Sequence, residues 1–136
     1  MASLPRMSRF AAITLAFAGL AGLVGVALGA LAAHGFPPDK KALLETASQY
    51  ALWHALAVTA AALAHERVRG WARRLFVAAA ACFAFGIVVF PGALVSLALN
   101  GKGGAAPVGG TAFLIGWALF SAAALTSLRH HRVDQP

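Results

Sequence analysis

The chain has 136 residues, of which 60% are hydrophobic and only 11% are charged. About a quarter of the residues of a water-soluble domain are charged, so this composition excludes a soluble globular fold and favours a protein solvated by lipid. The net charge of +7 does not indicate nucleic-acid binding, because the basic residues occupy short segments between apolar runs instead of one continuous face. We expect one domain, 1–136, with the lipid bilayer as its partner and no nucleic acid.

The first apolar run, Phe10 to Ala33, contains no charged residue and no histidine. A bilayer core of about 30 Å needs roughly 20 helical residues, so this run predicts a membrane-spanning helix over about 10–33. The small residues at its end would also fit a signal peptide. However, an apolar signal segment has only about 7–15 residues, so we expect the run to be retained.

Glycines recur along this first run at Gly22, Gly25 and Gly29. Small residues four apart let two membrane helices approach closely, so these glycines are predicted helix-packing positions. The alternative is that they only reflect an Ala- and Gly-rich composition.

A polar joint separates the first helix from a second one, predicted over about 42–65. Pro37 and Pro38 turn the chain, and Asp39 is the expected N-cap of the helix that follows. This second run is the most polar of the four. Several polar side chains fall within one arc of about 140°, and we expect that stripe to face the interior of a bundle. They are Thr46, Gln49, Tyr50 and His54.

The remaining two apolar runs predict helices over about 72–99 and 110–128. Pro91 lies inside the first of these and predicts a bend just before it. The Gly-rich loop between the two runs has no phosphate-binding pattern. Three glycines of the last run are further predicted helix-packing positions, namely Gly109, Gly110 and Gly116. The predicted fold is therefore all-α, an integral membrane bundle of four transmembrane helices with a kinked third helix.

The basic residues also predict an orientation. Four spans place the N-terminus, the loop between the second and third helices and the C-terminus on one side. That side carries Arg6, Arg9, Arg67, Arg69, Arg73, Arg74, Arg129 and Arg132. The other side carries only Lys40, Lys41 and Lys102. Because Lys and Arg are enriched in cytoplasmic loops, we expect a multi-pass protein of the plasma (inner) membrane with both termini in the cytoplasm.

Three stretches resemble signatures of the domain-of-unknown-function 423 family, also called the transmembrane protein 256-like family. They are the small-residue run Gly25–Gly35 ending in Ala-His-Gly, the Thr-Ala-x-x-Tyr-x-x-x-His pattern from Thr46 to His54, and the Pro-x-Gly-Gly-x-x-Phe-x-x-Gly-Trp pattern from Pro107 to Trp117. They lie in order across about 100 of the 136 residues. Pro91-Gly92-Ala93 departs from the family pattern. The resemblance implies a four-helix inner-membrane protein and implies no activity.

Few side chains could carry chemistry. The candidate residues for a ligand site or an interhelical polar site are His34, Glu45, Thr46, Gln49, Tyr50 and His54. His34 and His54 are expected at different depths, which argues against shared ligation of a metal ion or haem iron. The sequence contains no catalytic constellation, and we predict no enzyme activity, no metal and no cofactor. His65 is expected to be solvated at a loop edge, and Cys82 to be a small buried hydrophobe.

Two functional hypotheses follow. The first is a structural or accessory protein that packs with itself, as a homo-oligomer, or with a larger membrane complex. The second is a small-ligand, lipid or quinone binder, or a minor transporter, that uses the polar stripe around Tyr50 and His54. We favour the first, because isolated polar residues are ordinary stabilising groups between membrane helices.

Overall fold

The computed structural model describes residues 6–131, with side chains up to residue 128. It consists of four helices, α1 (Arg9–His34), α2 (Pro38–Arg67), α3 (Gly70–Asn100) and α4 (Ala106–His131). The all-α prediction is confirmed. Arg132, which was counted for the orientation, lies outside the described residues.

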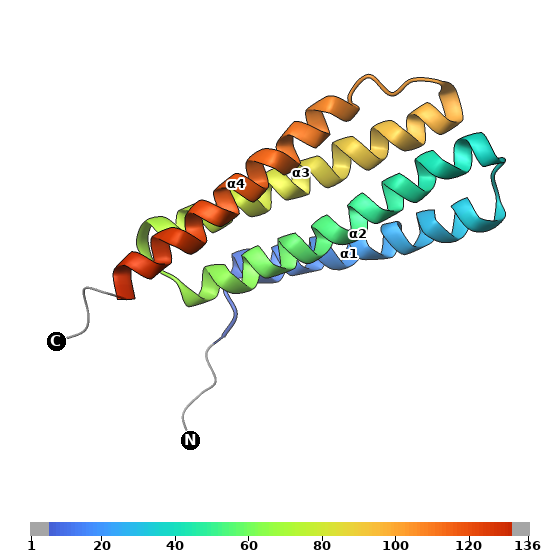
Figure 1. The fold of residues 1–136 in the computed structure, drawn as a ribbon. Coiled ribbons are helices and arrows are strands. Elements are labelled where there is room, and N and C mark those ends of the chain that lie inside the picture. The colour runs from blue at the N-terminus through green and yellow to red at the C-terminus, as the bar shows by residue number, and fades with distance from the viewer. Residues whose placement is uncertain (1–5, 132–136) are drawn as a thin grey trace.

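The helices form two hairpins lying side by side (Figure 1). Each helix packs mainly against its neighbours in the chain, so α2 and α3 are central while α1 and α4 are outermost. The α1–α2 and α3–α4 connections lie at one end, and the α2–α3 connection lies at the other, beside the start of α1 and the end of α4. The outer helix α1 touches α3 only marginally, which leaves one side of the molecule open.

Local sequence determines where the helices begin and end. The Ser8 hydroxyl accepts a hydrogen bond from the Ala11 N–H and caps α1. The expected cap of α2 is wrong, because Pro37 occupies the N-cap and Asp39 lies in the first turn. Proline suits the start of a helix because its missing N–H would lack a helical partner there anyway. Gly101 ends α3 with a φ of 70°, a left-handed conformation that favours glycine.

The proline inside α3 does not end the helix. Pro91 is buried, and α3 continues beyond it to Asn100. The bend expected just before Pro91 stays a prediction.

Three of the helices are long and apolar enough to cross a membrane: α1, α3, and α4 over Ala106–Leu128. In α2 the polar stripe lowers the hydropathy, so composition alone does not identify it as a span. Large apolar side chains are nevertheless exposed on all four helices, among them Leu20, Leu56, Val88 and Leu114. So many exposed large apolar side chains indicate a surface that is covered by a membrane or by another protein.

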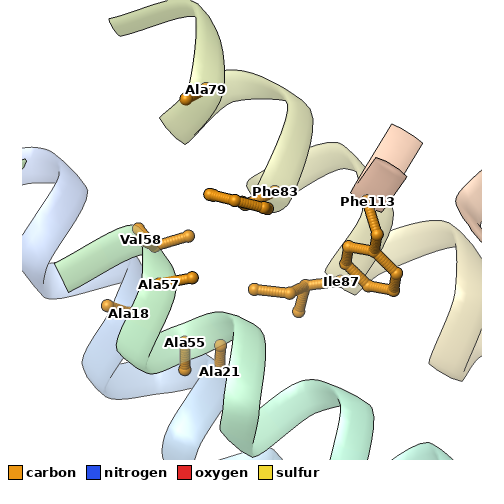
Figure 2. Close-up of a cluster of buried hydrophobic side chains, with 9 residues drawn as sticks. All are labelled: Ala18, Ala21, Ala55, Ala57, Val58, Ala79, Phe83, Ile87 and Phe113. Carbon is orange, nitrogen blue, oxygen red and sulfur yellow. The ribbon is translucent and has the colours of Figure 1, made fainter. Parts of the chain in front are cut away.

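The core between the helices consists mostly of small side chains with a few large ones inserted. Figure 2 shows Val58 of α2 pointing toward Phe83 of α3, with Ile87 and Phe113 beside them. Alanines of α1 and α2 meet behind this group. Because so many facing residues are alanine, the backbones can approach closely, which is how membrane helices gain packing energy.

Candidate functional site

His54 is the central polar side chain of the predicted stripe, and both of its ring nitrogens are engaged within the protein. Nδ1 lies 2.8 Å from the Tyr50 carbonyl oxygen, one helical turn back on α2. The Trp117 indole N–H of α4 donates to Nε2 across 3.3 Å. A carbonyl only accepts and an indole only donates. These partners therefore assign the neutral tautomer with its proton on Nδ1.

Aromatic rings enclose His54. It is only 6% exposed and stacks on Phe113, with ring centroids 3.5 Å apart and planes inclined by 14°. Phe83 and Tyr50 each lie 5.7 Å from it by centroid. The histidine is thus part of a packed aromatic cluster that joins α2, α3 and α4.

Glycines make room for these rings. A Cβ at Gly86 of α3 would clash with the Phe113 ring, and one at Gly116 of α4 would lie 2.7 Å from the Phe83 ring. Gly116 was among the predicted packing positions, whereas Gly86 was not. A glycine between aromatic residues in an apolar run is the only sequence signal that could have identified it.

The other predicted glycines of α4 lie against α3 at Phe90. A Cβ at Gly109 would lie 2.5 Å from the Phe90 backbone nitrogen, so the two backbones nearly touch there. Gly110 has more space, because its Cβ would come no closer than 3.9 Å to the Phe90 ring.

A second glycine contact joins α1 to α2. A Cβ at Gly25 would lie 2.8 Å from Leu52, and one at Gly29 would lie 2.9 Å from the Ser48 hydroxyl. That hydroxyl is buried and donates a 2.6 Å hydrogen bond to the Gly25 carbonyl. Gly22, predicted with them, has no atom within 4 Å of its Cβ position. The seam therefore involves two of the three predicted glycines and a serine that the sequence did not single out.

Most of the predicted stripe does not converge on His54. Gln49 and Glu45 are exposed, and Glu45 pairs with Lys41 at 3.7 Å. The Thr46 hydroxyl donates back to the Ala42 carbonyl of its own helix, and His34 is exposed at the end of α1. Only Tyr50 and His54 meet, because α2 packs its opposite flanks against α1 and α3 and the rest of the expected arc points outward.

A recess of about 460 Å³ lies elsewhere, between α1 and α3. Its walls are almost entirely apolar. They comprise Phe17, Leu20, Ala21, Val24 and Leu28 of α1, Ala51 of α2, and Ile87, Val88, Pro91, Gly92 and Val95 of α3. Tyr50 and His54 do not line it. A cavity with so few polar groups suits hydrocarbon or an apolar side chain.

A polar cluster ties the start of α1 to the α2–α3 connection. The Ser8 hydroxyl donates to one Glu66 oxygen at 2.6 Å, and its N–H donates to the other at 3.1 Å. These two bonds hold the pKa of Glu66 below its ordinary value. The Arg73 Nε–H donates to His65 Nε2 at 3.1 Å. The expectation that His65 is solvated is wrong: it is only 5% exposed, and its ring packs against Phe10 with the two planes inclined by 49°.

Metal-ligating side chains do not gather in the part of the chain whose side chains the structure describes. No group of three or more His, Cys, Asp or Glu residues lies close enough there to hold an ion. The site is therefore a packed aromatic and hydrogen-bonded cluster with an apolar recess on another face.

Comparison with known proteins places the chain in a family. The family model described as "Protein of unknown function (DUF423)" matches residues 28–110. The chain belongs to this family. This confirms the resemblance drawn from the motifs around His34, Tyr50 and Trp117.

The relatives found by sequence comparison are named as membrane proteins. A UPF0382 membrane protein of Haemophilus influenzae is 38% identical over 110 residues, covering 76% of this chain and 86% of the relative. The UPF0382 inner membrane protein YgdD of Escherichia coli K12 is 36% identical over 119 residues, covering 82% and 88%. The UPF0382 membrane protein YwdK of Bacillus subtilis is 35% identical over 114 residues, covering 78% and 90%. No solved structure matches. The chain is a membrane protein, and the relatives' names include no enzymatic activity.

Proposed function

We propose that this protein is a non-catalytic accessory protein of the inner membrane that crosses the bilayer four times. It acts by packing with itself or with a larger membrane complex. The observation that carries the proposal is the apolar recess between α1 and α3, because its wall includes the exposed Leu20 and Val88 and its lining side chains offer no polar group to recognise a soluble substrate.

The fourth crossing is argued from the position of α2. This helix lies antiparallel between α1 and α3 and packs along both, and these two neighbours are apolar enough to span. A helix held between them lies at the same depth. Two of its buried polar side chains, Ser48 and His54, are hydrogen-bonded within the protein, and its exposed Trp53 and Leu56 can face lipid.

The orientation rests on the arginines at one end of the bundle. Arginines flank α1 at its start and border the α2–α3 connection, whereas the two connections at the opposite end carry three lysines. This distribution supports cytoplasmic termini. In a Cys82→Ser background, a cysteine introduced at Lys102 is expected to react with an impermeant maleimide on spheroplasts. One introduced at Arg69 is expected to react only after lysis, and the reverse pattern would overturn the orientation.

We propose a transmembrane helix of a second copy or of a partner as the occupant of the recess. Gly92 in its wall has no atom within 4 Å of its Cβ position, so an incoming helix could approach the backbone closely there. Apolar walls give no directional contacts, so the packing of surface against surface would provide the affinity.

The test fills the recess. Gly92→Phe places a ring in it, whereas Gly19→Phe adds the same ring at a position that also has no neighbour within 4 Å but does not line the recess. After mild solubilisation, wild type and Gly19→Phe should retain a copurifying species in native mass spectrometry, and Gly92→Phe should lose it. A lone monomer in all three proteins would contradict the accessory role.

The alternative is a lipid or quinone binder. The apolar walls of the recess favour it, since a hydrocarbon tail would fit between α1 and α3 as well. Organic extracts of the three purified proteins separate the two functions. A lipid or quinone that is retained by wild type and lost only from Gly92→Phe, without any change in protein association, would favour the binder.

A further inference from the structure

Arginines concentrate at the short connection between α2 and α3. Arg67, Arg69, Arg73 and Arg74 are all exposed there, and Trp71 between them is 61% exposed. We call these five residues the basic turn. It lies at the same end of the bundle as the start of α1 and the end of α4.

Among the described side chains, Glu66 is the acid adjacent to the basic turn. It accepts two hydrogen bonds from Ser8, and its negative charge attracts Arg73, so the four arginines are compensated only in part. Within the described part of the chain, no arginine forms an ion pair with Asp or Glu, and the Nε–H of Arg73 is directed to the ring of His65. Several positive charges close together repel one another, so an external anion would stabilise this end of the bundle.

The start of α3 adds to the same positive potential. Its N-cap is Arg69, which makes no capping hydrogen bond through its side chain, and the first turn contains no acidic residue. The first N–H groups of a helix lack helical partners and carry a partial positive charge. Arginines at this end are electrostatically unfavourable, whereas a bound anion would be favourable.

The position of the tryptophan indicates where the anion comes from. The Arg74 guanidinium lies 5.8 Å from the centre of the Trp71 ring, and the uncharged part of α3 starts at Leu75. Exposed tryptophan beside arginine at the end of an apolar helix is typical of the membrane–water interface. Phosphate groups of lipids lie at this depth, and the planar guanidinium can bind phosphate through two hydrogen bonds.

We propose that the basic turn is a binding site for the phosphate headgroup of an anionic phospholipid. Arg67, Arg69 and Arg74 supply the charge, and Trp71 holds the turn at the interface. The opposite end offers a weaker site, because Lys41 there is paired with Glu45. Lysine also lacks the planar fork of arginine.

The experiment uses the full chain, purified in a neutral detergent, with dioleoyl phosphatidylglycerol as the probe. Phosphatidylcholine and inorganic phosphate serve as separate controls. The triple variant Arg67→Gln, Arg69→Gln, Arg74→Gln leaves Arg73 in place, because Arg73 contacts His65. The matched variant Lys40→Gln, Lys41→Gln, Lys102→Gln removes the same number of charges at the other end of the bundle.

Native mass spectrometry should show phosphatidylglycerol bound to wild type and to the lysine variant, and at least about tenfold weaker binding to the arginine variant. Equal weakening in both variants, or equal binding of phosphatidylcholine, would overturn the proposal. Displacement of the bound phosphatidylglycerol by inorganic phosphate would also overturn the proposal, because it would indicate a site for free anions. If the triple variant is not recovered, the single variants Arg69→Gln and Arg74→Gln are measured in its place. Each is expected to weaken binding of phosphatidylglycerol, and unchanged binding in either would count against the site.

Discussion

The Trp117 indole of α4 donates its N–H to His54 Nε2 of α2 across 3.3 Å, between two helices that do not pack along each other. The bond passes beside Phe83 of α3, whose ring lies 5.0 Å from Trp117 and 5.7 Å from His54 by centroid. One histidine of the central helix α2 therefore ties this helix to the outer helix α4. This role accounts for a buried histidine in α2 without any ligand.

The first prediction concerns this bond. In a double-mutant cycle with His54→Phe and Trp117→Phe, both substitutions keep an aromatic ring while removing the hydrogen bond. We expect a coupling energy of about 0.6 kcal/mol, and at most about 1.7 kcal/mol, as for other hydrogen bonds between membrane helices. Unfolding of the four proteins in mixed micelles measures it. Strictly additive losses would show that the contact contributes no stability of its own.

The sequence was sufficient to identify the helices but not the faces they bury. Long uncharged runs predict helices because lipid leaves the backbone no other partner, and the four helices lie at those runs. The arc of α2 was less predictable, since Gln49 is exposed while its neighbour Ser48 is buried against α1. An Ala-rich helix has no strong apolar stripe, so the facing helices decide which side is covered.

The aromatic cluster shows the same limit at the candidate site. Tyr50 and His54 were identified from their polarity, but their partners Phe83 and Phe113 look like any other apolar residue in the sequence. Knowing that a histidine is buried does not reveal which helix supplies the ring beside it. That choice depends on how α3 and α4 pack against each other, which is a property of tertiary structure.

The second prediction concerns the close approach of α3 and α4. Gly109→Ala should destabilise the protein by about 1–3 kcal/mol, because its Cβ would meet Phe90 backbone atoms that cannot rotate away. Gly116→Ala should cost less, since the Phe83 ring it meets belongs to a side chain. Thermal unfolding in detergent measures both.

The matched controls are Gly19→Ala and Gly22→Ala, where an added methyl group meets no atom within 4 Å. These changes should be neutral or stabilise by up to about 1 kcal/mol, because alanine favours helix over glycine. A loss at Gly22 equal to that at Gly109 would show that Gly22 also packs against a helix, in a contact between molecules.

The third prediction concerns the seam between α1 and α2. Ser48→Ala removes the hydrogen bond to the Gly25 carbonyl and should cost about 0.6–2 kcal/mol. Ser48→Val should cost more, because its extra methyl group is directed at Gly29, whose own Cβ position lies 2.9 Å from the hydroxyl. Thr59→Ala is the control, since its hydroxyl bonds only within α2. An equal loss in Thr59→Ala would argue against a special role of the seam.

The fourth prediction concerns the pH dependence of the contact between Ser8 and Glu66. The folded protein holds the pKa of Glu66 below its ordinary value, chiefly through the Ser8 hydroxyl and N–H. The unfolded chain therefore binds a proton more readily than the folded one as the pH falls. The contribution of the contact is fully present above the ordinary pKa, declines as the pH falls through it, and is lost below the lowered folded pKa.

The expected observation is that the start of α1 loosens in acid. The Ala11 and Ala12 amides are bonded to Ser8, so their hydrogen exchange reports on this contact. After correction for the intrinsic pH dependence of exchange, their exchange in wild type should accelerate as the pH falls below the ordinary range of a glutamate. Glu66→Gln should show faster exchange already at neutral pH and little further change in acid, because the amide does not titrate. Since Ser8→Ala also removes the cap of α1, only Glu66→Gln isolates the carboxylate. Retention of the wild-type acid response in Glu66→Gln would assign that response to another group.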